Sequence, residues 1–141
     1  MGNTQGKTKA EIWDELNDLN AQIDRLAYKR GMVKSAINTP LLQNMVGMCF
    51  KVHSGNSLAY IKVTDVVMPT GTEESFTEAY ANVLIFERTG SSVSVRLFEA
   101  YKESDIESHY PVGPQEFDKF AEECIASMQE SLAKAKKAIR G

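Results

Sequence analysis

The chain has 141 residues, of which 43% are hydrophobic and 25% are charged, and its formal net charge is -3. This composition is typical of a soluble globular protein, and we expect one domain over residues 1–141. The negative net charge excludes a general attraction to nucleic acid, so binding of that kind would need a local basic face. No apolar run approaches the roughly 20 residues of a membrane-spanning helix. The two cysteines, Cys49 and Cys124, lie far apart in the sequence and match no disulfide pattern, so we expect free thiols and a cytoplasmic location.

The first predicted element is a long helix over residues 8–38. Thr8 and Glu11 fit a capping box at its start. Pro40 is expected to end the helix, because the residue before a proline avoids the helical conformation. Gly31 costs about 1 kcal/mol inside a helix and marks a possible kink. An unbroken heptad pattern, with spacings of four and three, is formed by Ile12, Leu16, Leu19, Ile23, Leu26, Arg30, Val33 and Ile37.

This heptad pattern needs a partner, and two partners fit. The helix pairs either with the C-terminal helix of the same chain or with a second copy of itself. Both helices are acidic in the front half and basic in the back half, which favours antiparallel pairing. We expect a homo-oligomer, a dimer or larger, with an interface of Ile12, Leu16, Leu19, Ile23, Leu26 and Arg30. Arg30 either fixes the register of that pairing or points to water where the helix curves away.

A β-rich block follows over residues 45–101. Strands are predicted near 47–53, 58–67, 79–88 and 93–101, separated by the turn signals SGNS, MPTGT and RTGSS. Such short connections favour an antiparallel sheet of four to five strands or a small barrel. The alternation of apolar residues predicts three buried faces, formed by Met48, Phe50 and Val52, by Ala59, Ile61 and Val63, and by Val93, Val95 and Leu97.

The last predicted element is a helix over residues 114–140. Gly113 suits its cap and Pro114 its first position. Its apolar stripe consists of Phe117, Ala121, Cys124, Met128, Leu132, Ala135 and Ile139. The predicted fold class is therefore α+β, an antiparallel sheet or small barrel flanked by a long N-terminal heptad helix and a C-terminal helix.

Catalytic and metal-binding patterns are scarce. Cys49 and His53 fall on the same face of one strand but about 13 Å apart, too far for a nucleophile and its base. His109 lies in a loop far along the chain, and a structural zinc site needs four ligands. No phosphate-binding loop occurs. We expect no catalytic residue, no metal and no cofactor, although an enzyme with a site assembled between subunits is a third reading.

The side of the sheet opposite the predicted core carries basic and aromatic residues. Lys51, Tyr60, Lys62 and Arg96 are the candidate ligand-binding residues on that face. Aromatic side chains interleaved with basic ones suit a nucleotide, a nucleic acid or an acidic protein surface. The alternative is an ordinary solvent-facing sheet or the exterior of a barrel.

The chain resembles small bacteriophage proteins, mostly uncharacterised, over most of residues 38–128. The resemblance rests on a G-x-C-F-K strand (Gly47, Cys49, Phe50, Lys51), a Y-I-K-V strand (Tyr60 to Val63) and a closing helix introduced by P-x-E-F (Pro114, Glu116, Phe117). It implies a protein that inhibits a bacterial antiviral defence system, by binding a host protein or sequestering a signalling nucleotide. Together with the heptad pattern and the scarcity of catalytic patterns, the resemblance favours a non-enzymatic, oligomeric binding protein. The alternative is a nucleotide- or nucleic-acid-binding module that uses the basic and aromatic sheet face.

Overall fold

The protein has an α+β fold, which confirms the predicted class. The computed structural model describes residues 6–106 and 110–141. In chain order the elements are α1 (Lys9–Asn44), β1 (Cys49–Ser54), β2 (Ser57–Val67), β3 (Thr70–Gly71), β4 (Phe76–Thr77), β5 (Tyr80–Thr89), β6 (Ser92–Ala100), the 3-10 turn η1 (Glu103–Asp105), β7 (Tyr110–Val112) and α2 (Pro114–Arg140).

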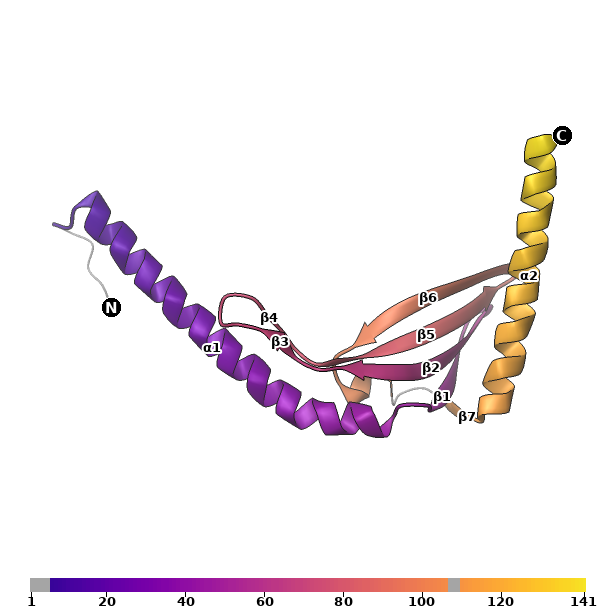
Figure 1. Cartoon of the computed structure of the whole chain (residues 1–141), viewed down its shortest axis with the longest axis horizontal. Coiled ribbons are helices and arrows are strands. Elements are labelled where there is room, and N and C mark those ends of the chain that lie inside the picture. Colours follow the sequence, from indigo (N-terminus) through magenta and orange to yellow (C-terminus); the bar gives the residue numbers. More distant parts are fainter. Residues whose placement is uncertain (1–5, 107–109) are drawn as a thin grey trace.

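Five strands form one antiparallel sheet in the order β6-β5-β2-β1-β7. Within the described residues β6 and β7 are its two edges, so the sheet is open and the small-barrel alternative is wrong. The four predicted strands correspond to β1, β2, β5 and β6. The two-stranded β3–β4 sheet, which extends the β2–β5 hairpin towards α1, and the short β7 were not predicted (Figure 1).

Each face of the sheet has its own apolar cluster. On one face, which we call the α1 face, Phe50, Ile61 and Val83 pack with Leu42 and Met45 from the end of α1. On the other, which we call the α2 face, the cluster consists of Cys49, Tyr60, Phe86, Phe117, Phe120, Ala121 and Cys124. Both faces are therefore used for packing, and the sheet has no fully exposed side.

Pro40 does not end the first helix. α1 continues to Asn44 with Pro40 inside it. The side chain of Leu42 is fully buried in the α1-face cluster, and burying a leucine stabilises the fold by about 1.5 to 3 kcal/mol. Met45 packs beside it. Packing of this last turn therefore offsets the roughly 3 kcal/mol by which a proline destabilises a helix interior. The local sequence alone does not indicate this packing.

The strand-face predictions hold for β2 and fail for β6. Ala59, Ile61 and Val63 are buried as predicted. On β1, Phe50 is buried and Val52 is half-buried, but Met48 is exposed. On β6, Val93 is half-buried and packs against the α2-face cluster, but Val95 and Leu97 are exposed. The register places Leu97 opposite Leu84, which lies opposite Lys62, so these three side chains share the α2 face.

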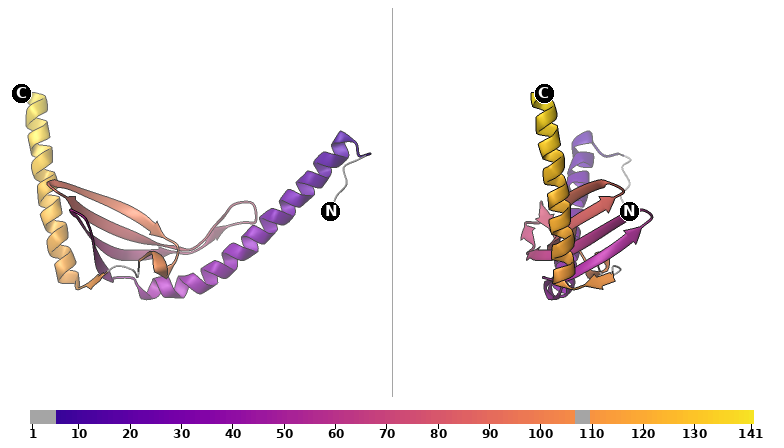
Figure 2. Two further views of the ribbon diagram at one scale, coloured as in Figure 1. Left: turned by 180° about the vertical axis from the view of Figure 1, so that it is seen from behind. Right: turned by 90° about the vertical axis from the view of Figure 1, so that its right-hand side faces the viewer.

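The two helices lie at opposite ends of the sheet, and both project beyond it (Figures 1 and 2). The first two-thirds of α1 extend away from the strands, and the C-terminal half of α2 rises past β6. The two helices of one chain therefore do not pair with each other. In the part of the chain that the structure describes, neither helix is apolar enough over a sufficient length to cross a membrane.

Candidate functional site

The heptad residues of α1 form an uncovered surface. We call this surface the α1 seam and define it as Ile12, Leu16, Leu19, Ile23, Leu26, Arg30, Val33 and Ile37. All eight side chains are exposed, and Leu26, Val33 and Ile37 are 65%, 61% and 62% exposed. Apolar side chains in this pattern on a free helix are typical of a helix that pairs with another helix.

The body of the protein contacts α1 on a different side. The buried residues of α1 are Gly31, Ser35, Thr39 and Leu42. Because an α-helix has 3.6 residues per turn, this stripe lies roughly 140° around the helix from the α1 seam. The seam therefore stays open even at Val33 and Ile37, where the opposite side of the same turns is buried.

The tip of the β3–β4 hairpin fixes the direction of α1. Phe76 packs edge-on against Tyr28, with ring centroids 5.1 Å apart. A Cβ atom on Gly31 would lie 2.5 Å from Cε1 of Phe76, so any other residue at this position would displace the Phe76 ring. The Ser35 hydroxyl accepts a hydrogen bond from the backbone N–H of Ala79 at 3.0 Å. Gly31 is thus a packing site inside a continuous helix, and no break occurs before Arg30.

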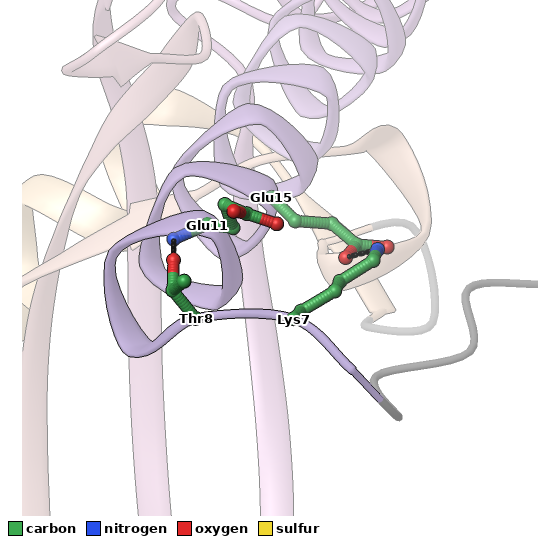
Figure 3. A network of polar contacts seen from close by, with 4 residues as sticks. All are labelled: Lys7, Thr8, Glu11 and Glu15. Atoms are coloured by element: carbon green, nitrogen blue, oxygen red, sulfur yellow. Dashed lines mark hydrogen bonds and ion pairs between the residues drawn. The ribbon is translucent and has the colours of Figure 1, made fainter.

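The free end of α1 is held by local polar contacts. The Thr8 hydroxyl accepts a hydrogen bond from the backbone N–H of Glu11 at 3.1 Å, which is the capping role predicted for Thr8 (Figure 3). Lys7 forms an ion pair with Glu15 across the first turns. These contacts stabilise the first turns of α1, where the α1 seam begins.

The predicted ligand-binding face is largely an internal interface. Tyr60 is 8% exposed and stacks on Phe120 of α2, with ring centroids 4.4 Å apart. Its hydroxyl donates a hydrogen bond to Oε2 of Glu116 at 2.6 Å. Burial and this hydrogen bond raise the pKa of Tyr60 to about 12. Tyr60 therefore joins the sheet to the start of α2.

Lys51 and Lys62 also face the first turns of α2. Nζ of Lys51 lies 3.7 Å from Oε2 of Glu116 and 5.7 Å from the ring centroid of Tyr110. Nζ of Lys62 lies 5.9 Å from the ring centroid of Phe117. Cation–π and ion-pair contacts of this kind add modestly to packing.

Arg96 does not join the other three residues. It lies opposite Ile85, which lies opposite Ile61, so Arg96 is on the α1 face. There it borders a groove of ≈ 250 Å³ between the sheet and η1, with Glu87 and Asp105 as the other charged residues. The expectation that Lys51, Tyr60, Lys62 and Arg96 share one exposed face is therefore wrong, because the face of β6 was assigned incorrectly.

Both cysteines and one of the two histidines fall within the described residues. Cys49 and Cys124 are buried free thiols in the α2-face cluster, and burial raises the pKa of each thiol. His53 lies at the exposed end of β1, and His109 lies outside the described residues. Among residues 6–106 and 110–141, no group of three or more His, Cys, Asp or Glu side chains is placed to hold a metal ion.

Comparisons with protein-family models, curated proteins and solved structures found no match. The bacteriophage resemblance therefore stays an expectation from short motifs. The exposed surfaces of the protein are the basis on which a function is proposed. Sequence reasoning found the α1 seam. It missed the exposed edge of β6 and the free end of α2, although the apolar stripe of α2 continues as far as Ile139.

Proposed function

We propose that this protein is a non-enzymatic binding protein that acts as a homo-oligomer, with α1 as an assembly element. The observation that carries the proposal is the α1 seam, a heptad surface that the chain's own body leaves uncovered along its whole length. A second copy of α1 supplies a surface of the same length and spacing.

An antiparallel arrangement uses every position of the α1 seam. Four pairs, each occurring twice about a twofold axis, then form its layers: Ile23 with Leu26 of the second copy, Leu19 with Arg30, Leu16 with Val33, and Ile12 with Ile37. The acidic front half of each α1 then lies beside the basic back half of the other. A parallel pair would place like charges together, so the charges select the antiparallel orientation.

The burial available is enough for a moderate affinity. The seven apolar side chains of the α1 seam are about half exposed, so covering each contributes roughly 1 kcal/mol. Two chains then gain about 14 kcal/mol, and an association cost of about 6 kcal/mol, within the usual range of about 4 to 15 kcal/mol, leaves roughly 8 kcal/mol of binding free energy. We therefore expect assembly at about micromolar concentration.

Sedimentation equilibrium of two charge variants tests this interface. Leu26→Asp places a charge at a seam position, whereas Ala21→Asp places the same charge on the same helix, roughly 140° away from Leu26. We expect a lower mass for Leu26→Asp and the wild-type mass for Ala21→Asp. A wild-type mass for Leu26→Asp, or a wild type that stays a single chain at micromolar concentration, would contradict the proposal.

The partner of the assembled protein is the second part of the proposal. The bacteriophage resemblance supports a host defence protein or a signalling nucleotide as the target. Native mass spectrometry of the intact purified protein tests the nucleotide form, because it reports a bound small molecule together with the number of chains. Phage plating on strains that each carry one defence system tests the inhibitor form. No restoration of plating in any strain would argue against it.

A further inference from the structure

The two edges of the main sheet differ in how well they are protected. β7 has three residues, Tyr110–Val112, and includes Pro111, so it offers few hydrogen-bonding groups to another strand. β6 has nine residues, Ser92–Ala100, and no strand lies on its outer side among the described residues. An exposed edge of this length is a template for a further strand unless something covers it.

The hairpin between β5 and β6 determines which backbone groups of β6 point outward. Gly90, with φ of +59°, and Ser91 form a two-residue turn that closes on Thr89 and Ser92. Such a turn closes on a hydrogen-bonded pair of residues. Pairs without hydrogen bonds then alternate with hydrogen-bonded pairs along the two strands. The register runs without a shift, so the N–H and C=O groups of Val93, Val95 and Leu97 point away from β5.

The free end of α2 extends past this edge. α2 begins beside β7, crosses the α2 face and continues beyond β6 (Figures 1 and 2). Met128 still packs against the sheet cluster. We call residues 129–140 the α2 overhang. It is roughly 18 Å long, which corresponds to about three or four further strands at their usual spacing.

The α2 overhang carries apolar side chains that remain exposed. Leu132 is 60% exposed and Ile139 is 84% exposed, on the side of α2 that faces the sheet lower down. An open space of ≈ 730 Å³ separates the base of the overhang from the β5–β6 turn, with Val93 and Leu132 among its lining residues. On β6 itself, Leu97 is 72% exposed on the same α2 face.

We propose that β6 pairs antiparallel with β6 of a second copy about a twofold axis at Val95, and that the α2 overhang of each copy covers the α2 face of the other. Val95 then lies opposite Val95 of the second copy, and Val93 lies opposite its Leu97. The outward backbone groups of all three residues form hydrogen bonds in this register. α2 crosses β6 near Val93, so its overhang passes over Leu97 of the second copy.

Self-complementarity selects a second copy as the occupant. The α2-face side chains of β6 are apolar at three alternate positions, and each pairs with another apolar residue in this register. A register centred on Arg96 would oppose two like charges, whereas the one centred on Val95 places Arg96 opposite Ser94. The two chains form one continuous sheet, and the α2 overhang of each chain covers the β6 edge of the other.

This surface is separate from the α1 seam and does not depend on it. With both interfaces, each chain contacts two others, so the wild type forms a closed tetramer or a longer chain of copies. Loss of one interface leaves a dimer held by the other, and loss of both leaves single chains. The two proposals can therefore fail independently.

Sedimentation equilibrium of point variants tests the β6 interface. Val95→Pro removes an outward N–H and blocks the edge without breaking a bond to β5, whereas Val95→Thr keeps the N–H and serves as its control. Leu132→Asp charges the α2 overhang, and Ala133→Asp is its control, about 100° around the helix. We expect both test variants to fall to the mass of two chains and both controls to keep the wild-type mass.

Combination with the α1 variant separates the two interfaces. Leu26→Asp alone should leave a dimer, and Leu26→Asp with Leu132→Asp should give single chains. Because Leu132 is exposed on a helix, its variant should fold even if Val95→Pro does not. The β6 pairing is overturned if folded Leu132→Asp keeps the wild-type mass, or if Leu26→Asp alone gives single chains.

Discussion

Replacing Tyr60 by phenylalanine removes one hydroxyl from the interface between the sheet and α2. The ring stays in place and keeps its stacking on Phe120. What is lost is the hydrogen bond of 2.6 Å to Glu116. Glu116 is partly exposed, so water can replace that donor. The expected cost at neutral pH is therefore about 1 kcal/mol of unfolding free energy.

At alkaline pH the same substitution should stabilise the protein. The pKa of Tyr60 is raised to about 12, first by burial and then by its bond to Glu116. An unfolded tyrosine has a pKa of about 10. A raised pKa means that the native state binds the proton more tightly, so the stabilisation is complete below pH 10 and is lost as pH rises towards 12. Two pH units correspond to about 2 to 3 kcal/mol.

Urea unfolding followed by far-ultraviolet circular dichroism measures this effect. Protein concentration must be constant, because the stability of an oligomer depends on it. Tyr60→Phe should be less stable than wild type at pH 8 and more stable near pH 12. Tyr110→Phe removes a hydroxyl from a residue that is 69% exposed and should follow the wild-type profile. Parallel profiles for wild type and Tyr60→Phe across pH 10–12 would refute the buried, hydrogen-bonded role of Tyr60.

Three further substitutions have expected outcomes. Arg30→Leu should tighten self-association about tenfold or more, or change the number of chains, because it removes the one polar residue of the α1 seam; sedimentation equilibrium measures both. Gly31→Val should destabilise the contact with the β3–β4 hairpin by about 1 to 3 kcal/mol, and Phe76→Ala should recover part of that loss in a double-mutant cycle. Leu42→Ala should cost about 2 to 5 kcal/mol in urea unfolding, whereas Leu41→Ala, at a position 40% exposed, should cost far less.

Local patterns predicted the elements well. The Thr8 cap, the heptads of α1 and the turn signals between strands act through neighbours in the chain, so they can be identified without the rest of the molecule. The end of α1 could not be found in this way. Its last turn is stabilised by burial of Leu42 among residues from distant strands.

The two candidate sites differ in the same way, because one depends on a local pattern and the other on tertiary packing. The α1 seam depends on spacing within one helix, and the sequence was sufficient to define it. The ligand-binding face depended on which side of each strand is covered. For an edge strand such as β6 the apolar pattern points to a face that the chain itself leaves exposed. Arg96 was therefore assigned to the wrong face, and Tyr60 was expected at the surface.

By itself, the sequence determined the presence of the two helices, the four main strands, the α+β class and the α1 seam, because periodicity and turn chemistry are local properties. Only the tertiary structure decided strand order, the burial of Tyr60, the placement of the two helices at opposite ends of the sheet and the exposed edge of β6. These features depend on contacts between residues far apart in the chain, and such contacts leave no periodic signal in either segment alone.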